Sequence, residues 1–382
     1  MIVVIKSAYI HIPFCEHICH YCDFNKVFLK NQPVDAYLEF MDVEMKNTID
    51  RFPTQNLETI FVGGGTPTAL NQKQLSYLLE SIQRNFDVVP DIEYTFEANP
   101  GDLSLEKLRL LKEGGVNRLS FGVQSFNDDL LKRIGRSHRK TDVFKSIEHA
   151  REVGFDNISV DLIYSLPDQT VEDFQDTLHT AFSLGMEHYS AYSLIIEPKT
   201  VFYNLMSKGK LPLPTQEEET SMYDVLLNEM EKHGYHQYEI SNFAKEGYES
   251  KHNLTYWDNE SYYGIGAGAH GYTEGVRRAN HGPLKKYMDS ISETGFPYKE
   301  EHVVTREERI EEEMFLGLRK TQGVSISRFE RKFDAEMLNI LKGPIEENIQ
   351  KGLLEQQGDF ICLTKKGKFL GNEVFQAFIS AI

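Results

Sequence analysis

Two alternating hydrophobic patterns occupy the first 200 residues of the chain. Short runs rich in β-branched and aromatic residues, bounded by Gly, Pro or Asn, are typical of buried strands. These runs are residues 8–13, 58–68, 92–100, 117–126, 157–167 and 188–198. Between them lie segments with apolar residues at helical spacing, such as residues 34–49, 71–86 and 171–185. Strands that alternate with helices predict β-α units and a parallel sheet.

The polar residues favour a barrel over an open, doubly wound sheet. Each predicted strand ends in residues that can carry chemistry, namely Cys15, Gly63 to Thr66, Glu97, Gln124, Asp161 and Glu197. In a (β/α) barrel the functional groups gather at the C-terminal rim, whereas a doubly wound sheet concentrates them at one switch point. We therefore predict an α/β fold with a partial (β/α)6 barrel over residues 1–200.

The alternation of strands and helices stops near residue 200. Residues 201–300 contain a helical segment and a glycine-rich one, and we interpret them as an extension of the barrel. Residues 301–382 predict a smaller, mostly helical C-terminal domain with a short hairpin, which is winged-helix-like. From residue 306 onward there are 12 basic and 13 acidic residues, a net charge of -1. A DNA-reading domain should be basic, so a helical cap on the barrel is the preferred interpretation.

Composition excludes several partners. The 382 residues carry a formal net charge of -17, which disfavours nucleic acid because such binding depends on neutralising phosphates. The longest apolar runs are strand-sized, so no transmembrane segment is predicted. The first residues lack the basic leader and long apolar stretch of a signal peptide. We therefore predict a cytoplasmic protein, in which cysteines are more often ligands or catalysts than disulfide partners.

Three cysteines lie close together near the start of the chain. Cys15, Cys19 and Cys22 form a C-x3-C-x2-C pattern, which indicates a loop folded around one bound object. Zinc normally takes four ligands, and His17 or His20 in the same loop can supply the fourth. A [4Fe–4S] cluster normally takes four thiolates, so three would leave one iron open to a non-protein ligand.

This cysteine spacing, with an aromatic residue before the third cysteine, resembles the radical S-adenosylmethionine (SAM) superfamily. The motifs YIHIPFC, YCDF, GGGTPT, EANP, GVQSF, GRSH, DLIYSLPDQT and HNLTYW are similar to those of the family around oxygen-independent coproporphyrinogen III oxidase. The resemblance covers essentially the whole chain. It implies a [4Fe–4S] cluster held by the three cysteines, with the SAM amino and carboxylate groups on the fourth iron. Reduction then cleaves SAM to methionine and a 5′-deoxyadenosyl radical.

Two departures separate this chain from the oxidase branch of the family. That branch carries a fourth cysteine two residues after the third and a long N-terminal arm, whereas this chain has Phe24 there and eight residues before Tyr9. Both departures favour the heme-chaperone branch, which implies heme as a further ligand and heme-accepting proteins, such as respiratory cytochromes, as partners. The alternatives are oxidative decarboxylation of coproporphyrinogen III and an unrelated radical reaction. Whether the protein is an enzyme stays open, and a homodimer is among the oligomeric states the sequence allows.

The resemblance also assigns residues to SAM. The positions that match the family's cofactor contacts are Tyr9, Tyr21, Gly64, Gly65, Thr66, Glu97, Gln124, Arg136, Asp161 and Ile195. The chemistry suits these roles, because glycines allow close backbone approach and an arginine can pair with the SAM carboxylate. The alternative for the two tyrosines is an ordinary place in the core.

The segment HNLTYW carries the heme prediction. By resemblance, His252 is the axial ligand of the heme iron, and Tyr256 and Trp257 cover the porphyrin. Neutral imidazole suits heme iron, but the alternative is a hydrogen-bonded surface histidine. Arg277 and Arg278 are either propionate contacts or, as the safer interpretation, part of a solvated turn.

Overall fold

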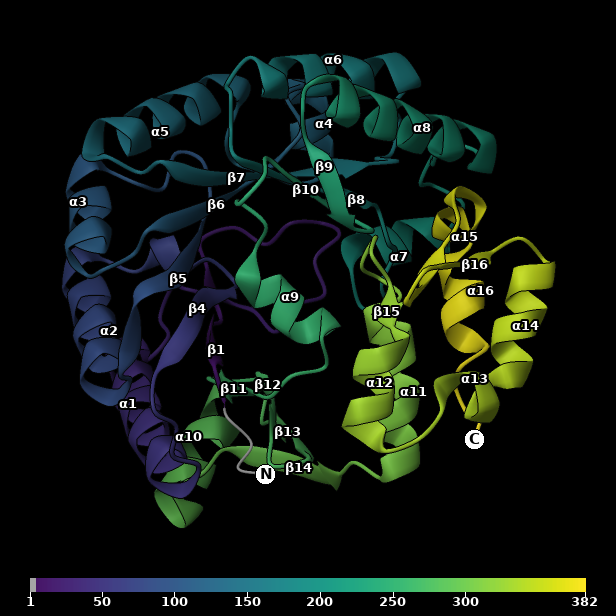
Figure 1. The fold of residues 1–382 in the computed structure, drawn as a ribbon. Helices are drawn as coiled ribbons and strands as arrows, with labels where there is room; N and C mark the ends of the chain where they lie inside the picture. The colour runs from purple at the N-terminus through teal and green to yellow at the C-terminus, as the bar shows by residue number, and fades with distance from the viewer. Residues whose placement is uncertain (1–4) are drawn as a thin grey trace.

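A computed structural model describes residues 5–382. Residues 1–4, which begin the segment compared above with a signal peptide, lie outside the described residues. The predicted parallel strands are all present and lie side by side at the centre of one 12-stranded sheet (Figure 1). They are β1 (Ser7–Ile12), β4 (Leu57–Gly64), β5 (Val88–Ala98), β6 (Arg118–Gln124), β7 (Asn157–Tyr164) and β8 (His188–Ser193). Two short strands, β2 (Phe14–Cys15) and β3 (Val27–Phe28), pair separately. The prediction of a parallel α/β sheet is confirmed.

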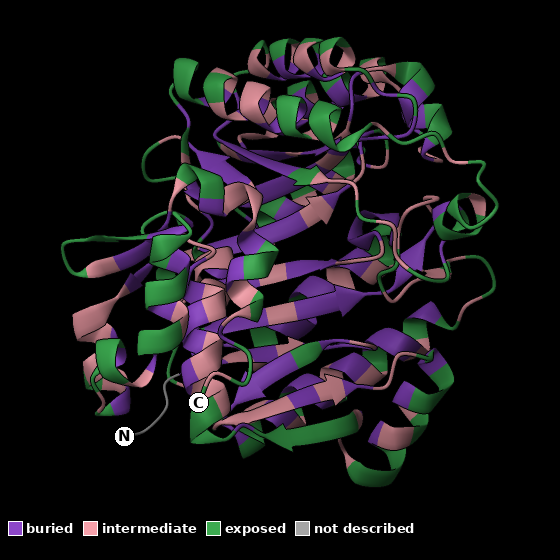
Figure 2. Cartoon of the chain, turned by 90° about the vertical axis from the view of Figure 1, so that its right-hand side faces the viewer, coloured by how far each residue is buried: buried purple, intermediate pink, exposed green. Residues whose placement is uncertain are grey.

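Helices cover the outer side of the curved sheet (Figure 1). Several begin at side chains that cap the free backbone N–H groups, as Asn71 and Thr170 do in capping boxes with Gln74 and Asp173. The outer helices are α1 (Val34–Arg51), α2 (Gln72–Asn85), α3 (Leu105–Glu113), α5 (Lys140–Val153) and α6 (Val171–Phe182). The short elements η1 (Pro67–Ala69) and α4 (Asp128–Arg133) follow the C-terminal ends of β4 and β6. The central strands are largely buried, whereas the outward faces of the helices are exposed (Figure 2).

The sheet is extended at both edges by strands within residues 236–303, which the sequence pattern did not assign to strands. Beside β8 lie β10 (Asn242–Ala244) and β9 (His236–Glu239), and beside β1 lie β11 (Tyr262–Ile265), β12 (His270–Thr273), β13 (Val276–Asn280) and β14 (Tyr298–Val303). The helices of residues 201–300 are α7 (Val201–Met206), α8 (Gln216–Lys232), α9 (Lys251–Trp257) and α10 (Leu284–Thr294). Helix α9 differs from the others because it lies inside the curve of the sheet, against β4 (Figure 1).

The C-terminal elements form a separate hydrophobic core at one side of the molecule (Figure 1). The expected hairpin forms, and β15 adds a third strand that the pattern did not predict. The elements are α11 (Arg306–Gly317), β15 (Val324–Ser325), α12 (Ile326–Phe333), α13 (Met337–Ile340), α14 (Lys342–Gln350), β16 (Leu354–Gln357), β17 (Phe360–Leu363), α15 (Lys365–Phe369) and α16 (Gly371–Gln376). None of the helices in residues 5–382 is long and apolar enough to cross a membrane.

Candidate functional site

The three cysteines lie on the loop that follows β1, at the C-terminal rim of the sheet. Cys15 is buried and ends the short strand β2, while Cys19 and Cys22 are half-buried. Backbone hydrogen bonds fix both ends of the loop, from Val27 N to Pro13 O at 2.8 Å and from Leu29 N to Cys15 O at 2.9 Å. None of the three cysteines is in a disulfide. The loop therefore presents three thiols at the edge where a barrel places its chemistry.

The surroundings of the sulfurs fit an iron–sulfur cluster. The Thr66 hydroxyl donates to Cys15 Sγ at 3.6 Å, and an Arg136 N–H donates to Cys19 Sγ at 3.3 Å. Such donors stabilise thiolates, which are the form that binds iron. Burial nevertheless raises the pKa of the Cys15 thiol to about 11 and also raises that of Cys22. A bound cationic centre would supply the positive charge that these buried thiolates need.

Glycine is required where β4 meets the cysteine loop. A Cβ on Gly65 would lie 2.8 Å from the carbonyl carbon of Pro13, 2.9 Å from Phe14 O and 3.0 Å from Cys15 Sγ. Gly64 has a φ of +117°, which residues with a side chain rarely adopt. Hydrogen bonds hold the two segments together, including Thr66 N to Phe14 O at 2.8 Å. The GGGT segment therefore forms one wall of the cysteine site.

The zinc alternative would use a histidine of the loop. His20 is turned away, because its Nδ1 lies 3.0 Å from the carbonyl oxygen of Arg133 and its ring packs on Phe202. Among residues 5–382, no three His, Cys, Asp or Glu side chains converge as ligands of a single metal ion. The thiolates of a cluster bind separate iron atoms and need not converge in this way.

Polar side chains from neighbouring strands face the inside of the sheet next to this wall. Glu97 on β5 accepts a hydrogen bond from Gly64 N at 3.0 Å, and Asp161 on β7 accepts one from Ser120 Oγ at 3.1 Å. Burial, and then the charge of Asp161, raise the pKa of Glu97 to about 8, and burial raises the pKa of Asp161. Gln124 ends β6 with a φ of 66°, a strained conformation typical of functional sites.

Of the remaining predicted SAM residues, some lie at the cysteine site and one lies away from it. Arg136 donates to Asn99 Oδ1 at 2.7 Å as well as to Cys19, so it lies within the cysteine site. The Tyr9 hydroxyl lies 2.9 Å from His11 Nδ1, and Tyr21, which lies in the cysteine loop itself, packs against the apolar cluster of Leu130 and Leu131. Ile195 is 68% exposed on the loop after β8, so the structure does not gather it with the others.

His252 lies deep inside the curve of the sheet. It is 1% exposed, its Nδ1 is 2.8 Å from Thr59 Oγ1, and its Nε2 is 2.8 Å from the Tyr256 hydroxyl. The interpretation as a surface histidine is therefore wrong. Both ring nitrogens are engaged in hydrogen bonds, so neither is open to iron in this state. The role as heme ligand stays a prediction.

The sequence pattern did not reveal two buried ionisable side chains that act on this histidine, Glu93 and Arg118. Glu93 on β5 accepts the N–H groups of Lys251 and His252 at 2.9 and 3.0 Å and so caps α9. Arg118 at the start of β6 is 2% exposed. Burial, and then the charge of Arg118, lower the pKa of His252 to about 3, so the imidazole is neutral. Glu93 in β5 and Arg118 in β6 both point to the inner face of the sheet. Strand alternation shows which residues share a face, but it does not show which face is the inner one.

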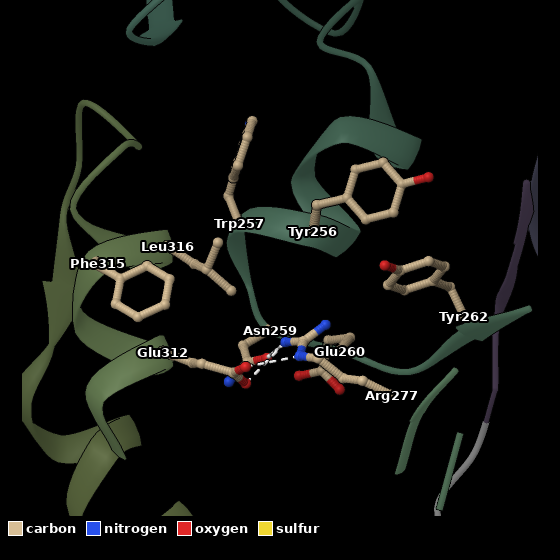
Figure 3. Close-up of a pocket in the computed structure, with 9 residues that line it drawn as sticks. All are labelled: Tyr256, Trp257, Asn259, Glu260, Tyr262, Arg277, Glu312, Phe315 and Leu316. Carbon is tan, nitrogen blue, oxygen red and sulfur yellow. Dashed lines mark hydrogen bonds and ion pairs between the residues drawn. The ribbon is translucent and has the colours of Figure 1, made fainter. Parts of the chain in front are cut away.

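A cleft of about 410 Å³ opens between α9, the edge strands and α11 (Figure 3). Its lining residues are Tyr256, Trp257, Asn259, Glu260, Tyr262, Arg277, Glu312, Phe315 and Leu316. Arg277 and Arg278 lie in β13 and form ion pairs with Glu312 and Glu301 at 2.6 and 2.8 Å. The solvated-turn interpretation of the two arginines is therefore wrong.

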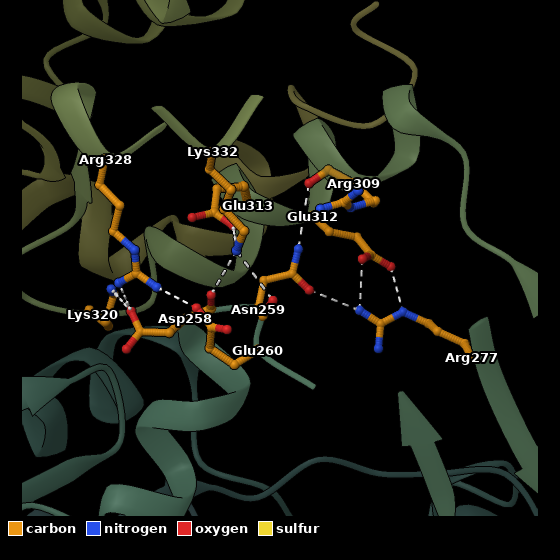
Figure 4. A network of polar contacts seen from close by, with 10 residues as sticks. All are labelled: Asp258, Asn259, Glu260, Arg277, Arg309, Glu312, Glu313, Lys320, Arg328 and Lys332. Carbon is orange, nitrogen blue, oxygen red and sulfur yellow. Dashed lines mark hydrogen bonds and ion pairs between the residues drawn. The ribbon is translucent and has the colours of Figure 1, made fainter. Parts of the chain in front are cut away.

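Ion pairs join the segment after α9 to the C-terminal domain (Figure 4). Asp258 accepts hydrogen bonds from Lys320 and, at 2.9 Å, from Arg328. Lys332 reaches the backbone oxygen of Asp258 at 3.2 Å and pairs with Glu313 at 2.7 Å. The domain is thus attached directly beside the HNLTYW helix.

Comparisons with known proteins agree with this geometry. Residues 9–181 match the radical SAM superfamily, and residues 304–370 match the HemN C-terminal domain. The chain is similar over its whole length to a solved structure of coproporphyrinogen III oxidase (HemN) from Escherichia coli, a radical SAM enzyme. The TM-score is 0.88 and the identity 26%, covering 100% of this chain and 92% of the other. The superfamily implies a [4Fe–4S] cluster and SAM as cofactors.

Curated relatives identify the branch. The chain is 58% identical to heme chaperone HemW of Bacillus subtilis, covering 99% of this chain and 100% of the relative. It is 46% identical to HemW of Lactococcus lactis, covering 98% and 97% of the two chains. It is also 31% identical to HemW of Escherichia coli, covering 98% of each. The chain belongs to the heme chaperone HemW family of radical SAM proteins.

Proposed function

We propose that this protein binds a [4Fe–4S] cluster, SAM and heme, and delivers heme to acceptor proteins. The observation that carries the proposal is the three-thiol loop at the end of β1, with donors from Thr66 and Arg136 at two of its sulfurs. Phe24, where the oxidase branch has a fourth cysteine, is 64% exposed on this loop. The curated relatives that carry the chaperone name support the heme part of the proposal.

Cys15, Cys19 and Cys22 would hold the cluster and leave one iron for SAM. Once bound, the cluster would supply the electron that cleaves the SAM sulfonium bond. The residues proposed to hold SAM are Tyr9, Tyr21, Gly64, Gly65, Thr66, Glu97, Gln124, Arg136, Asp161 and Ile195. Arg136 is suited to the SAM carboxylate because its fixed fork can bind two oxygens at once. Glu97 is suited to the amino group or to ribose hydroxyls, because it already accepts from Gly64 N at the glycine wall.

The finer parts of the proposal concern organisation and partners. Residues 1–200 would form the barrel core, 201–300 its extension with the HNLTYW helix, and 301–382 the C-terminal domain. The separate hydrophobic core of the C-terminal elements supports this last boundary. Respiratory cytochromes are the proposed heme acceptors, a homodimer is the proposed alternative to a monomer, and the cytoplasm is the proposed location.

The test is anaerobic reconstitution followed by heme titration. We expect about four irons and one heme per chain, and loss of the cluster when Cys19 is replaced by Ala. His252→Ala should weaken heme binding, and unchanged affinity and spectrum would contradict any role of His252 in the heme site. The same preparation is assayed with coproporphyrinogen III. Multiple turnovers to protoporphyrinogen would replace the chaperone proposal with the oxidase reaction.

A further inference from the structure

One side chain ties the cysteine loop to a segment that is distant in the sequence. Asn25 follows Cys22 by three positions, and its side-chain Nδ2 donates to the carbonyl oxygens of Ala267 and Gly282 at 2.8 and 3.0 Å. These acceptors lie in the barrel extension, 242 and 257 positions later in the chain. A side-chain amide has two N–H groups, so both donors of Asn25 are used in this contact.

The backbone of Asn25 is held as well. Its carbonyl oxygen lies 2.7 Å from Nε2 of His11, a buried residue near the end of β1. Burial lowers the pKa of His11, so its ring is neutral. Because a carbonyl oxygen can only accept, Nε2 carries the ring proton, and Nδ1 accepts from the Tyr9 hydroxyl at 2.9 Å. Asn25 is therefore positioned from β1 on one side and from the barrel extension on the other.

The receiving segment leaves just enough space for the Asn25 side chain. A Cβ on Gly268 would lie 2.8 Å from Cβ, Cγ and Nδ2 of Asn25. A Cβ on Gly282 would lie 3.0 Å from Asn25 Oδ1. Glycine at these two positions allows the backbone to approach the amide closely, which a side chain would prevent.

The receiving segment is itself fixed to the rest of the molecule. Gly268 N donates to His281 O at 3.0 Å, which joins the two turns that carry the acceptors. The buried carboxyl group of Glu44 on α1 accepts from Gly266 N at 2.9 Å and from Asn280 Nδ2 at 2.8 Å. The two acceptor carbonyls therefore belong to a part of the protein that is held in place independently of the cysteine loop.

Of the three thiols, that of Cys22 depends most on this contact. Among residues 5–382, no side chain donates a hydrogen bond to Cys22 Sγ, whereas Thr66 and Arg136 donate to the other two sulfurs. Cys22 is instead placed through its backbone, whose carbonyl oxygen accepts from Lys26 Nζ. Asn25 lies between these two residues, so its contacts define where the third thiol is presented.

We propose that Asn25 is a positioning residue for the iron–sulfur cluster. Through Ala267 and Gly282 it holds Cys22 in place, so the barrel extension determines how firmly the cluster is retained. This inference rests on the proposed cluster and deepens it, because it assigns cluster retention to a contact outside the cysteine motif. A Cys22 thiolate that is less well held leaves its iron more often, and the iron is then open to a chelator.

The test measures how fast a chelator removes iron from the full-length, anaerobically reconstituted protein, followed by the loss of the visible absorbance of the cluster. Asn25→Ala removes both donors, and we expect iron loss to become at least about tenfold faster. Asn47→Ala is the matched control, because it removes a 2.8 Å hydrogen bond from an asparagine amide to the carbonyl oxygen of Gly295. This control should lose iron like the unmodified protein.

A second variant acts on Asn25 from the other side of the contact. The three atoms nearest to a Cβ added at Gly282 all belong to Asn25, and Gly282 is not among the glycines with positive φ. Gly282→Ala should therefore accelerate iron loss by pressing on Asn25, whereas Gly343→Ala, with nothing within 4 Å, should not. In the double variant with Asn25→Ala the close contact is gone, so iron loss should be no faster than in Asn25→Ala alone.

The outcomes separate this inference from the proposed function. If the unmodified protein takes up no iron and sulfide, both fail. If it loads a cluster and Asn25→Ala retains it at the unmodified rate, or if the two substitutions act additively, the positioning role is overturned and the cluster stands. Cluster-free Asn25→Ala should unfold within a few degrees of the unmodified protein. A much lower Tm would show that Asn25 stabilises the fold in general, and it would also overturn the positioning role.

Discussion

At the scale of single residues, Glu44 of α1 is a carboxylate enclosed by protein. It is fully buried, and it accepts hydrogen bonds from Gly266 N at 2.9 Å, from Asn280 Nδ2 at 2.8 Å and from the Tyr287 hydroxyl. These donors tie α1 to the glycine-rich segment and to α10. Burial dominates over the three donors and raises the pKa of Glu44 from 4.5 to about 7. The titratable groups facing it are Tyr37, Tyr287 and Tyr298, whose pKa values burial also raises.

A pH dependence of stability follows from Glu44. Between pH 4.5 and about 7 the folded chain keeps a proton on Glu44 that the unfolded chain has lost. The contribution of Glu44 to the free energy of unfolding is therefore highest below pH 4.5 and falls as the pH rises to about 7. The decline is on the order of 3 kcal/mol. Glu44→Gln should flatten the fall in unfolding free energy over this range, measured by urea denaturation. Glu300→Gln, at an exposed position, is the control, and an unchanged slope in Glu44→Gln would contradict the assignment.

At the scale of elements, the contact between the end of β4 and the cysteine loop depends on the lack of a side chain at Gly65. Gly65→Ala would force the Pro13 to Cys15 segment away by several tenths of an ångström. We expect a cost of about 1–3 kcal/mol and a lower iron content after reconstitution. Iron and sulfide analysis checks this, with Gly343→Ala as control because nothing lies within 4 Å of its added Cβ. Full cluster loading of Gly65→Ala would show that the loop adapts.

Patterns within elements explain how far the sequence could predict the site. Short runs rich in β-branched and aromatic residues located the six central strands, and the spacing of three cysteines located the thiols, because both signals are local. The partners of His252 could not be found in this way. Thr59 on β4 contacts the imidazole, whereas Glu93 on β5 accepts the backbone N–H of His252, and only the packing of α9 against the sheet creates these contacts. The edge strands after residue 200 were missed because they are short, at three to six residues each.

At the scale of the whole molecule, the C-terminal domain is attached through charges that cluster around Asp258 (Figure 4). Asp258→Asn should weaken the attachment by about 1–2 kcal/mol, because hydrogen bonds to charged groups are the stronger ones. Amide exchange in α11 and α12 should then be about tenfold faster, since 1.4 kcal/mol is a factor of ten. Asp289→Asn, which breaks an exposed pair with Lys285 within α10, is the control. Unchanged exchange in Asp258→Asn would mean that apolar packing alone holds the domain.

The strand β4 connects the surroundings of His252 with the cysteine loop. β4 carries Thr59, which contacts the α9 histidine, and the first residue after the strand is Gly65, which supports the cysteine loop. A ligand that moved α9 against β4 would act on the same strand that supports the wall against which SAM would sit, and through it the two sites would be coupled. Thermodynamic linkage makes such an influence mutual, so whatever factor heme imposes on SAM affinity, SAM must impose on heme affinity.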